Sequence, residues 1–227
     1  MATQLSFHEY RMQVGRGGPR RGAGRKPSER RCDPKRAREK FDRLTAVHVT
    51  LRVSDEVRSL RSRAFIAEIR TSFLALKQRV DFRLLHYSFQ SDHVHLIVEA
   101  ENHEALGRGM KAVSSRIARA AHRVFEISGK VLRGPYHAHL LHSAAEAHRA
   151  IAYVLLNIRK HWSQKHRQAP RVKIDEASSS RWFEGFSRQL PAQRAGECEV
   201  SRPRSWLLSK GWRRYGLIDP ALIPGAA

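Results

Sequence analysis

The sequence of 227 residues predicts an α+β fold in which helices cover one face of an antiparallel sheet. Alternating apolar and polar residues, the period of a half-buried strand, occur over 47–53, 83–90 and 93–99. Apolar residues instead recur every three or four positions over 60–79 and 104–125, which is typical of amphipathic helices.

The three predicted strands share an uncommon composition on their polar side. The apolar positions are Val47, Val49, Leu51, Val53, Leu85, Tyr87, Phe89, Val94, Leu96 and Val98. The polar positions are His48, Thr50, Arg52, His86, Ser88, Gln90, His93 and His95. Because alternate residues of a strand share a face, the apolar set predicts contact with the helices and the polar set predicts an open, histidine-rich face.

The second half of the chain adds a strand and a helix. A short strand is expected near 136–142, and Ser143 with Glu146 forms the capping pattern that opens a helix. The order strand, helix, strand, strand, helix, strand matches the split β-α-β arrangement of a ferredoxin-like sandwich, here with an extra C-terminal helix. We expect a flexible basic arm over 1–43, a catalytic domain over 44–163 and a basic extension over 164–227.

The charge of the chain indicates a polyanionic partner. There are 43 Lys and Arg against 21 Asp and Glu, a formal net charge of +22, which favours nucleic acid. No run of about 18 apolar residues is present to span a bilayer. The cysteines, Cys32 and Cys198, have no metal-site spacing. We expect a cytoplasmic, nucleoid-associated protein without membrane contact.

Two groups of residues carry candidate chemistry. His93 and His95 lie on one side of a strand, where two imidazoles can hold a divalent metal or serve only as structural or exposed side chains. On the last helix, Tyr153 and Asn157 are one turn apart, away from the predicted apolar stripe and beside Lys160. They face either a neighbouring site or only water.

These residues resemble a known family. His93-Val94-His95 followed by Tyr153 in Ala152-Tyr153-Val154-Leu155-Leu156-Asn157 is similar to the single-tyrosine HUH transposases, closest to the REP-associated tyrosine transposases. The resemblance spans roughly 44–163. Many relatives have Asn-Pro where this chain has Asn157-Ile158.

The resemblance implies metal-dependent nicking and joining of single-stranded or hairpin DNA. It implies that Tyr153 is the nucleophile of a covalent 5′-phosphotyrosine intermediate, and that His93, His95 and Asn157 bind Mg²⁺ or Mn²⁺. Basic residues of the arm, strands and helices are expected to contact DNA: Arg16, Arg20, Arg25, Arg52, Arg116, Arg119 and Lys160. The protein would act as a monomer or homodimer. Lys160 and His86 are both candidates for the general base.

Two other functions remain open from the sequence. One is a DNA-binding protein of transposase ancestry that does not cut. The other is an RNA-binding ferredoxin-like domain, which would place aromatic residues on the open sheet face, where this chain has His, Ser, Thr and Gln. The tryptophans of the last third, Trp162, Trp182, Trp206 and Trp212, either stack on bases or anchor the extension, and we favour anchoring.

Overall fold

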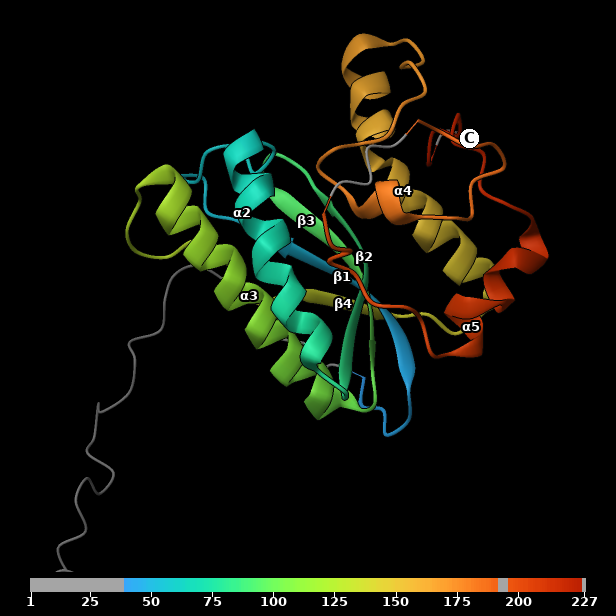
Figure 1. Ribbon diagram of the computed structural model, residues 1–227, viewed down its shortest axis with the longest axis horizontal. Coiled ribbons are helices and arrows are strands. Elements are labelled where there is room, and N and C mark those ends of the chain that lie inside the picture. The colour runs from blue at the N-terminus through green and yellow to red at the C-terminus, as the bar shows by residue number, and fades with distance from the viewer. Residues whose placement is uncertain (1–38, 192–195, 226–227) are drawn as a thin grey trace, which may run out of the picture. The chain divides into compact units, whose positions relative to one another are not determined.

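A computed structural model describes residues 39–191 and 196–225, which belong to one compact unit, Arg38–Ala227. Figure 1 shows its helices and strands. The strands are β1 (Thr45–Arg52), β2 (Phe82–Phe89), β3 (His93–Ala100) and β4 (His137–Leu140). The α-helices are α2 (Arg63–Leu74), α3 (His103–Phe125), α4 (Ala144–His166) and α5 (Trp206–Ser209). The 3-10 helices are η1 (Ala75–Gln78), η2 (Ser179–Trp182) and η3 (Gly211–Tyr215).

The four strands form one antiparallel sheet in the order β2-β3-β1-β4. The two central strands, β3 and β1, are therefore neighbours although 40 residues separate them in the chain. This order, with α2 after β1 and α3 after β3, is the predicted ferredoxin-like arrangement, and the prediction of the fold is confirmed.

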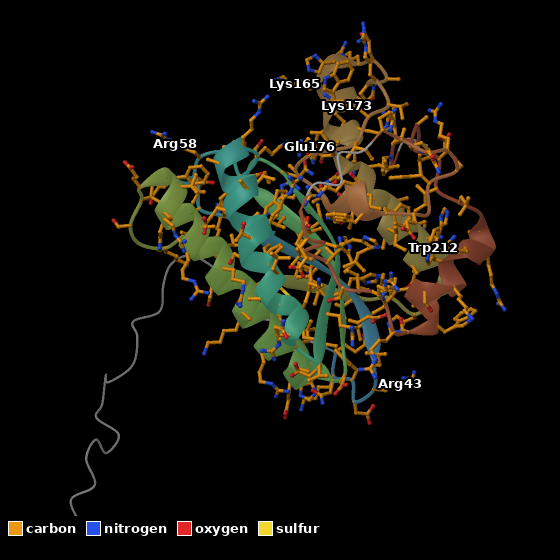
Figure 2. All side chains as sticks on the ribbon, in the orientation of Figure 1. Arg43, Arg58, Lys165, Lys173, Glu176 and Trp212 are labelled. Atoms are coloured by element: carbon orange, nitrogen blue, oxygen red, sulfur yellow. The ribbon has the colours of Figure 1, made fainter. Side chains whose placement is uncertain are left out.

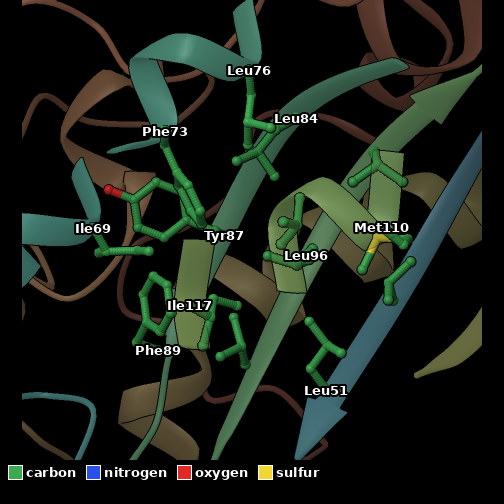
Figure 3. Close-up of a cluster of buried hydrophobic side chains, with 14 of the residues drawn as sticks. Leu51, Ile69, Phe73, Leu76, Leu84, Tyr87, Phe89, Leu96, Met110 and Ile117 are labelled. Atoms are coloured by element: carbon green, nitrogen blue, oxygen red, sulfur yellow. The ribbon is translucent and has the colours of Figure 1, made fainter. Parts of the chain in front are cut away.

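Helices α2 and α3 pack together on one face of the sheet (Figure 1). Each begins where a side chain accepts a backbone N–H of the first turn: Ser62 accepts from Phe65, and Asn102 accepts from Ala105. Their apolar stripes meet the inward side chains of the strands in a hydrophobic core. Figure 3 labels part of this core: Leu51, Ile69, Phe73, Leu76, Leu84, Tyr87, Phe89, Leu96, Met110 and Ile117.

A bulge in β2 corrects one detail of the predicted strand pattern. The pairing of β2 with β3 shifts register between Leu84 and His86. Leu85 was expected beside Tyr87 and Phe89, yet it packs in the separate apolar cluster on the opposite face. A bulge adds one residue to a strand, so strict alternation fails at that point.

The second face of the sheet is covered, which corrects the expectation of an open face. Helix α4 contacts β2 and β3 there, and the C-terminal segment packs beside it (Figure 1). Ser88 is fully buried and Gln90 is 3% exposed. Ser143 caps α4 as predicted and accepts from the N–H of Glu146, whereas the Glu146 carboxylate accepts from the N–H of His142, one residue before the expected partner.

A buried carboxylate anchors the C-terminal segment to the sheet. Glu99 of β3 accepts hydrogen bonds from the backbone N–H groups of Arg204 and Ser205 and from the Ser205 hydroxyl. Trp212 is 3% exposed and packs against the cluster around α4 (Figure 2), whereas Trp206 is 52% exposed. For Trp212, the structure therefore shows the expected anchoring role.

Candidate active site on the α4 face of the sheet

The pairing of β1 with β3 brings together His48, His93 and His95, which we call the histidine cluster. Thr50 is directly opposite His95, and Arg52 is opposite His93. Residues that face each other across an antiparallel pair lie on the same side of the sheet. Nδ1 of His95 is 3.1 Å from Oγ1 of Thr50 and 3.2 Å from Nε2 of His48. One ring nitrogen of His95 is thereby engaged by β1.

His93 is oriented by its sequence neighbour. Its Nδ1 lies 2.8 Å from Oδ1 of Asp92, and its ring centroid is 4.9 Å from that of His95 in an edge-on arrangement. An imidazole that donates Nδ1–H to a carboxylate keeps a lone pair on Nε2, the form in which histidine binds metals. Asp92 therefore supports a ligand role for His93.

Helix α4 brings Tyr153 to this cluster. The Tyr153 ring centroid is 5.0 Å from that of His95 and 5.9 Å from that of His48, both edge-on. Nζ of Lys160 lies 5.1 Å from the centroid of the Tyr153 ring. The phenol, three imidazoles and one cation thus come from strands and a helix that lie far apart in the sequence.

Asn157 lies one helical turn after Tyr153 and is fully buried. Neither its Oδ1 nor its Nδ2 has a hydrogen-bond partner among the described residues, and Nε2 of His95 is likewise buried without one. An unsatisfied buried polar group costs about 1–3 kcal/mol. The described protein groups therefore leave buried polar atoms of both Asn157 and His95 unsatisfied.

Burial keeps the central imidazoles neutral. Desolvation lowers the pKa of His95 to about 3, and repulsion from His48, His93, His161 and Lys160 contributes. Desolvation also lowers the pKa of His48 to about 4, with a smaller contribution from His139. Both rings are neutral near pH 7, which is the state a metal ligand requires.

The donor set fits a divalent cation. The predicted ligands offer two imidazole nitrogens, from His93 and His95, and the amide oxygen of Asn157. Within 39–191 and 196–225, no group of three or more His, Cys, Asp and Glu side chains is arranged to hold a metal.

Three residues of the cluster were not predicted as site residues. His48 and Thr50 contact His95, and the ring centroid of His161 is 5.6 Å from that of His93. Their signals were in the sequence: His48 and Thr50 alternate on the polar side of the first strand, and His161 follows Asn157 by one turn. The register of β1 and β3 brings His48 and Thr50 to His95, whereas the packing of α4 on the sheet brings His161 to His93.

Of the seven basic residues expected to contact DNA, four lie in the described part of the chain. Arg52 is exposed at the end of β1 opposite His93, and Lys160 lies over Tyr153. Arg119 is exposed on α3, across the sheet from this site. Arg116, also on α3, donates to the carbonyls of Ser72 and Ala112 and so ties α2 to α3.

The remaining predicted positions lie away from Tyr153 or outside the described chain. Arg16, Arg20 and Arg25 fall outside the described residues. His86, one of the two candidates for the general base, contacts Phe183 in a separate cavity. Lys160 is the candidate that stands beside Tyr153.

Part of the chain matches a known protein family. Residues 43–139 match the model of the family described as "Transposase IS200 like". This part of the chain is similar to the IS200-like transposases. The match includes His93 and His95 and ends before α4, so it does not include Tyr153 or Asn157. Transposases are DNA-processing enzymes.

Solved structures with similar folds include two transposases. One is a REP-associated tyrosine transposase bound to a REP hairpin, with 11% identity, a TM-score of 0.47, and coverage of 57% of this chain and 74% of that chain. The other is a proposed transposase from Deinococcus radiodurans R1, with 13% identity, a TM-score of 0.36, and coverage of 60% and 98%. No curated protein matches this chain. None of the described helices is long and apolar enough to cross a membrane.

Proposed function

We propose that this IS200-like protein nicks and joins single-stranded or hairpin DNA through a covalent bond to Tyr153. The observation that supports the proposal best is the edge-on approach of the Tyr153 ring to His95, at 5.0 Å between centroids. A phenol from α4 beside the His-x-His pair of β3 combines a nucleophile with metal-ligand chemistry in one place.

Neighbouring side chains orient the two imidazoles of the proposed site. Asp92 orients His93, and Thr50 with His48 engages Nδ1 of His95, so both rings keep Nε2 for a ligand. His93, His95 and Asn157 would hold Mg²⁺ or Mn²⁺. When bound, the cation polarises the scissile phosphate and neutralises charge on its non-bridging oxygens. Lys160 adds a positive charge beside the phenol, where a phosphate would approach.

The reaction conserves the energy of the phosphodiester bond. The Tyr153 oxygen forms a bond to phosphorus as the bond from phosphorus to the 3′ oxygen breaks. The products are a 5′-phosphotyrosine and a strand that ends in a free 3′-hydroxyl, which takes up the proton released by the phenol. Attack by the 3′-hydroxyl of another strand reverses these steps and joins the ends, with no external energy source.

A denaturation-resistant DNA adduct tests this proposal. The protein is mixed with Mn²⁺ and labelled single-stranded hairpins of varied flanking sequence, and the products are separated under denaturing conditions. We expect an adduct that is lost in Tyr153→Phe while DNA binding is retained. Tyr215→Phe is the matched control, since Tyr215 is an exposed tyrosine of η3 outside the histidine cluster, and it should form the adduct normally.

The alternative function predicts a different outcome. A DNA-binding protein of transposase ancestry would bind the same hairpins yet form no adduct with any of them, although the protein is folded. An adduct of equal yield in Tyr153→Phe would instead contradict the assignment of the nucleophile.

A further inference from the structure

A cavity of about 930 Å³ separates the outer edge of the sheet from the C-terminal segment. One wall is β2, which is an edge strand, and contributes Arg83, Leu85 and His86. The opposite wall contains Phe183 and Trp212. We call this cavity the β2 cleft. None of the residues assigned to the Tyr153 site lines it.

Two nitrogen atoms on the β2 wall lack partners. Nε of Arg83 and Nδ1 of His86 are buried, and neither has a hydrogen-bond partner among the described residues. Arg83 stands opposite Glu99 in the strand register, yet the Glu99 carboxylate is taken by Arg204 and Ser205. Since buried polar groups are normally satisfied, the two atoms indicate a ligand with polar groups of its own.

Aromatic rings form the other side of the β2 cleft. The Phe183 ring is 5.4 Å from that of His86 and 5.5 Å from that of Trp212, between centroids. A Cβ atom at Gly185 would collide with the rings of both Phe183 and Trp212, so only glycine permits this arrangement. Such ring surfaces are suited to stacking against a planar base.

The charges around the β2 cleft favour an anion. Four cationic side chains line it, against the single carboxylate of Glu184. They are Lys77, Arg83, Arg202 and Arg213. Lys77 is paired with Glu197 at 2.8 Å, and the Arg213 guanidinium lies 4.9 Å from the Trp212 ring centroid. A ligand that is both aromatic and anionic satisfies all of these features, and a nucleotide has that chemistry.

We propose that the β2 cleft binds one unpaired nucleotide of single-stranded DNA, with its base against Phe183 and Trp212 and its phosphate on Arg83. The choice of DNA as the ligand rests on the proposed function. The β2 cleft is then a second anchoring point for the strand, outside the site of chemistry. His86, which lies between the bulge and the Phe183 ring, supplies a hydrogen bond to the base.

Affinity for a short oligonucleotide tests the proposal. The full chain carrying Tyr153→Phe is titrated with fluorescein-labelled oligothymidylate of five nucleotides, without metal, and anisotropy is recorded. We expect Arg83→Gln to weaken binding about tenfold, the size typical for loss of a hydrogen bond to a charged group. Lys111→Gln is the matched control, because Lys111 is exposed on α3 across the sheet, and should weaken binding less than about twofold.

The rate at which maleimide modifies Cys198 tests the proposal without a substitution in the wall of the β2 cleft. This half-buried thiol lines the β2 cleft, and burial raises its pKa, so it should react slowly with maleimide. In Cys32→Ser protein, saturating oligothymidylate should slow the modification of Cys198 at least fivefold. Inorganic phosphate and an acidic peptide of the same charge should protect it less.

The outcomes separate this inference from the proposed function. Equal weakening by Arg83→Gln and Lys111→Gln, or unchanged modification of Cys198 with bound oligonucleotide, would overturn the β2 cleft as a nucleotide site. Better protection by the acidic peptide would reassign it to a protein partner. Adduct formation by the unmodified protein reports only on Tyr153, so either idea can fail while the other stands.

Discussion

Oγ1 of Thr50 lies 3.1 Å from Nδ1 of His95, across the pairing of two central strands. The contact engages one nitrogen of the imidazole and leaves Nε2 buried without a partner among the residues described. Groups that orient a metal-binding histidine contribute to affinity although they never touch the metal. Thr50 is thus a positioning residue for the proposed site.

Replacement of Thr50 tests this positioning role. Thr50→Val keeps the shape of the side chain but removes the hydroxyl, so we expect Mn²⁺ affinity to fall about 10- to 100-fold. Titration of Mn²⁺ followed by electron paramagnetic resonance gives the dissociation constant. Thr71→Val is the control, since Thr71 is exposed and its hydroxyl donates to the Ala67 carbonyl within α2. Unchanged affinity in Thr50→Val would show that His95 needs no such support.

Metal and DNA should bind cooperatively. The proposed ligands, two imidazoles and the Asn157 amide, are neutral and leave the charge of a divalent cation uncompensated. A DNA phosphate supplies that charge, so we expect Mn²⁺ to bind Tyr153→Phe protein about tenfold tighter with hairpin DNA than without it.

Two histidine variants serve as controls for the Mn²⁺ titration with and without hairpin DNA. His95→Ala should abolish specific binding, whereas His122→Ala should not, because Nε2 of His122 bonds the Gly129 carbonyl on the α3 side. Chelation of metal by EDTA should also stop adduct formation, and added Mn²⁺ should restore it. Equal Mn²⁺ affinity with and without DNA would argue for a charged ligand outside the proposed set.

Replacement of two glycines of α3 by alanine should change the free energy of unfolding in opposite directions. Gly107 is exposed with open space around it, so Gly107→Ala should raise the free energy of unfolding by about 0.5–1 kcal/mol. At buried Gly109, the added methyl group would collide with the Phe82 ring of β2. Gly109→Ala should therefore lower the free energy of unfolding by about 1–3 kcal/mol. Urea denaturation measures both, and equal effects would contradict the close approach of α3 to β2.

His86 should make the protein sensitive to acid. Burial lowers its pKa to about 4, from an ordinary value near 6.5. The unfolded chain then takes up a proton before the folded protein does, so stability is complete above pH 6.5 and falls toward pH 4. The loss attributable to His86 is at most about 3 kcal/mol.

The pH dependence of urea denaturation measures the contribution of His86 to the loss of stability at low pH. His86→Leu should flatten the decline between pH 6.5 and pH 4, although His48 and His95 also contribute, because burial lowers the pKa of each. His166→Gln, at an exposed position, serves as the control. A decline in His86→Leu as steep as in the unmodified protein would show that His86 takes no part.

Residue periodicity alone predicts the elements and most of their faces. The period-two pattern of β1 and β3 and the helical stripe of α3 follow from backbone geometry, which acts over neighbouring residues. The same rule put His93 and His95 on one side of β3 and set Tyr153 and Asn157 one turn apart on α4. The order of elements then limited the sheet to few topologies.

Long-range packing determines which side chains meet. The approach of His48 and Thr50 to His95 depends on strand register, and the turn of Leu85 onto the α4 face follows from a bulge in β2. The burial of Asn157 depends on how α4 and the C-terminal segment pack over the sheet. These contacts join residues far apart in the chain, so their geometry is set by long-range packing, which no local periodicity encodes.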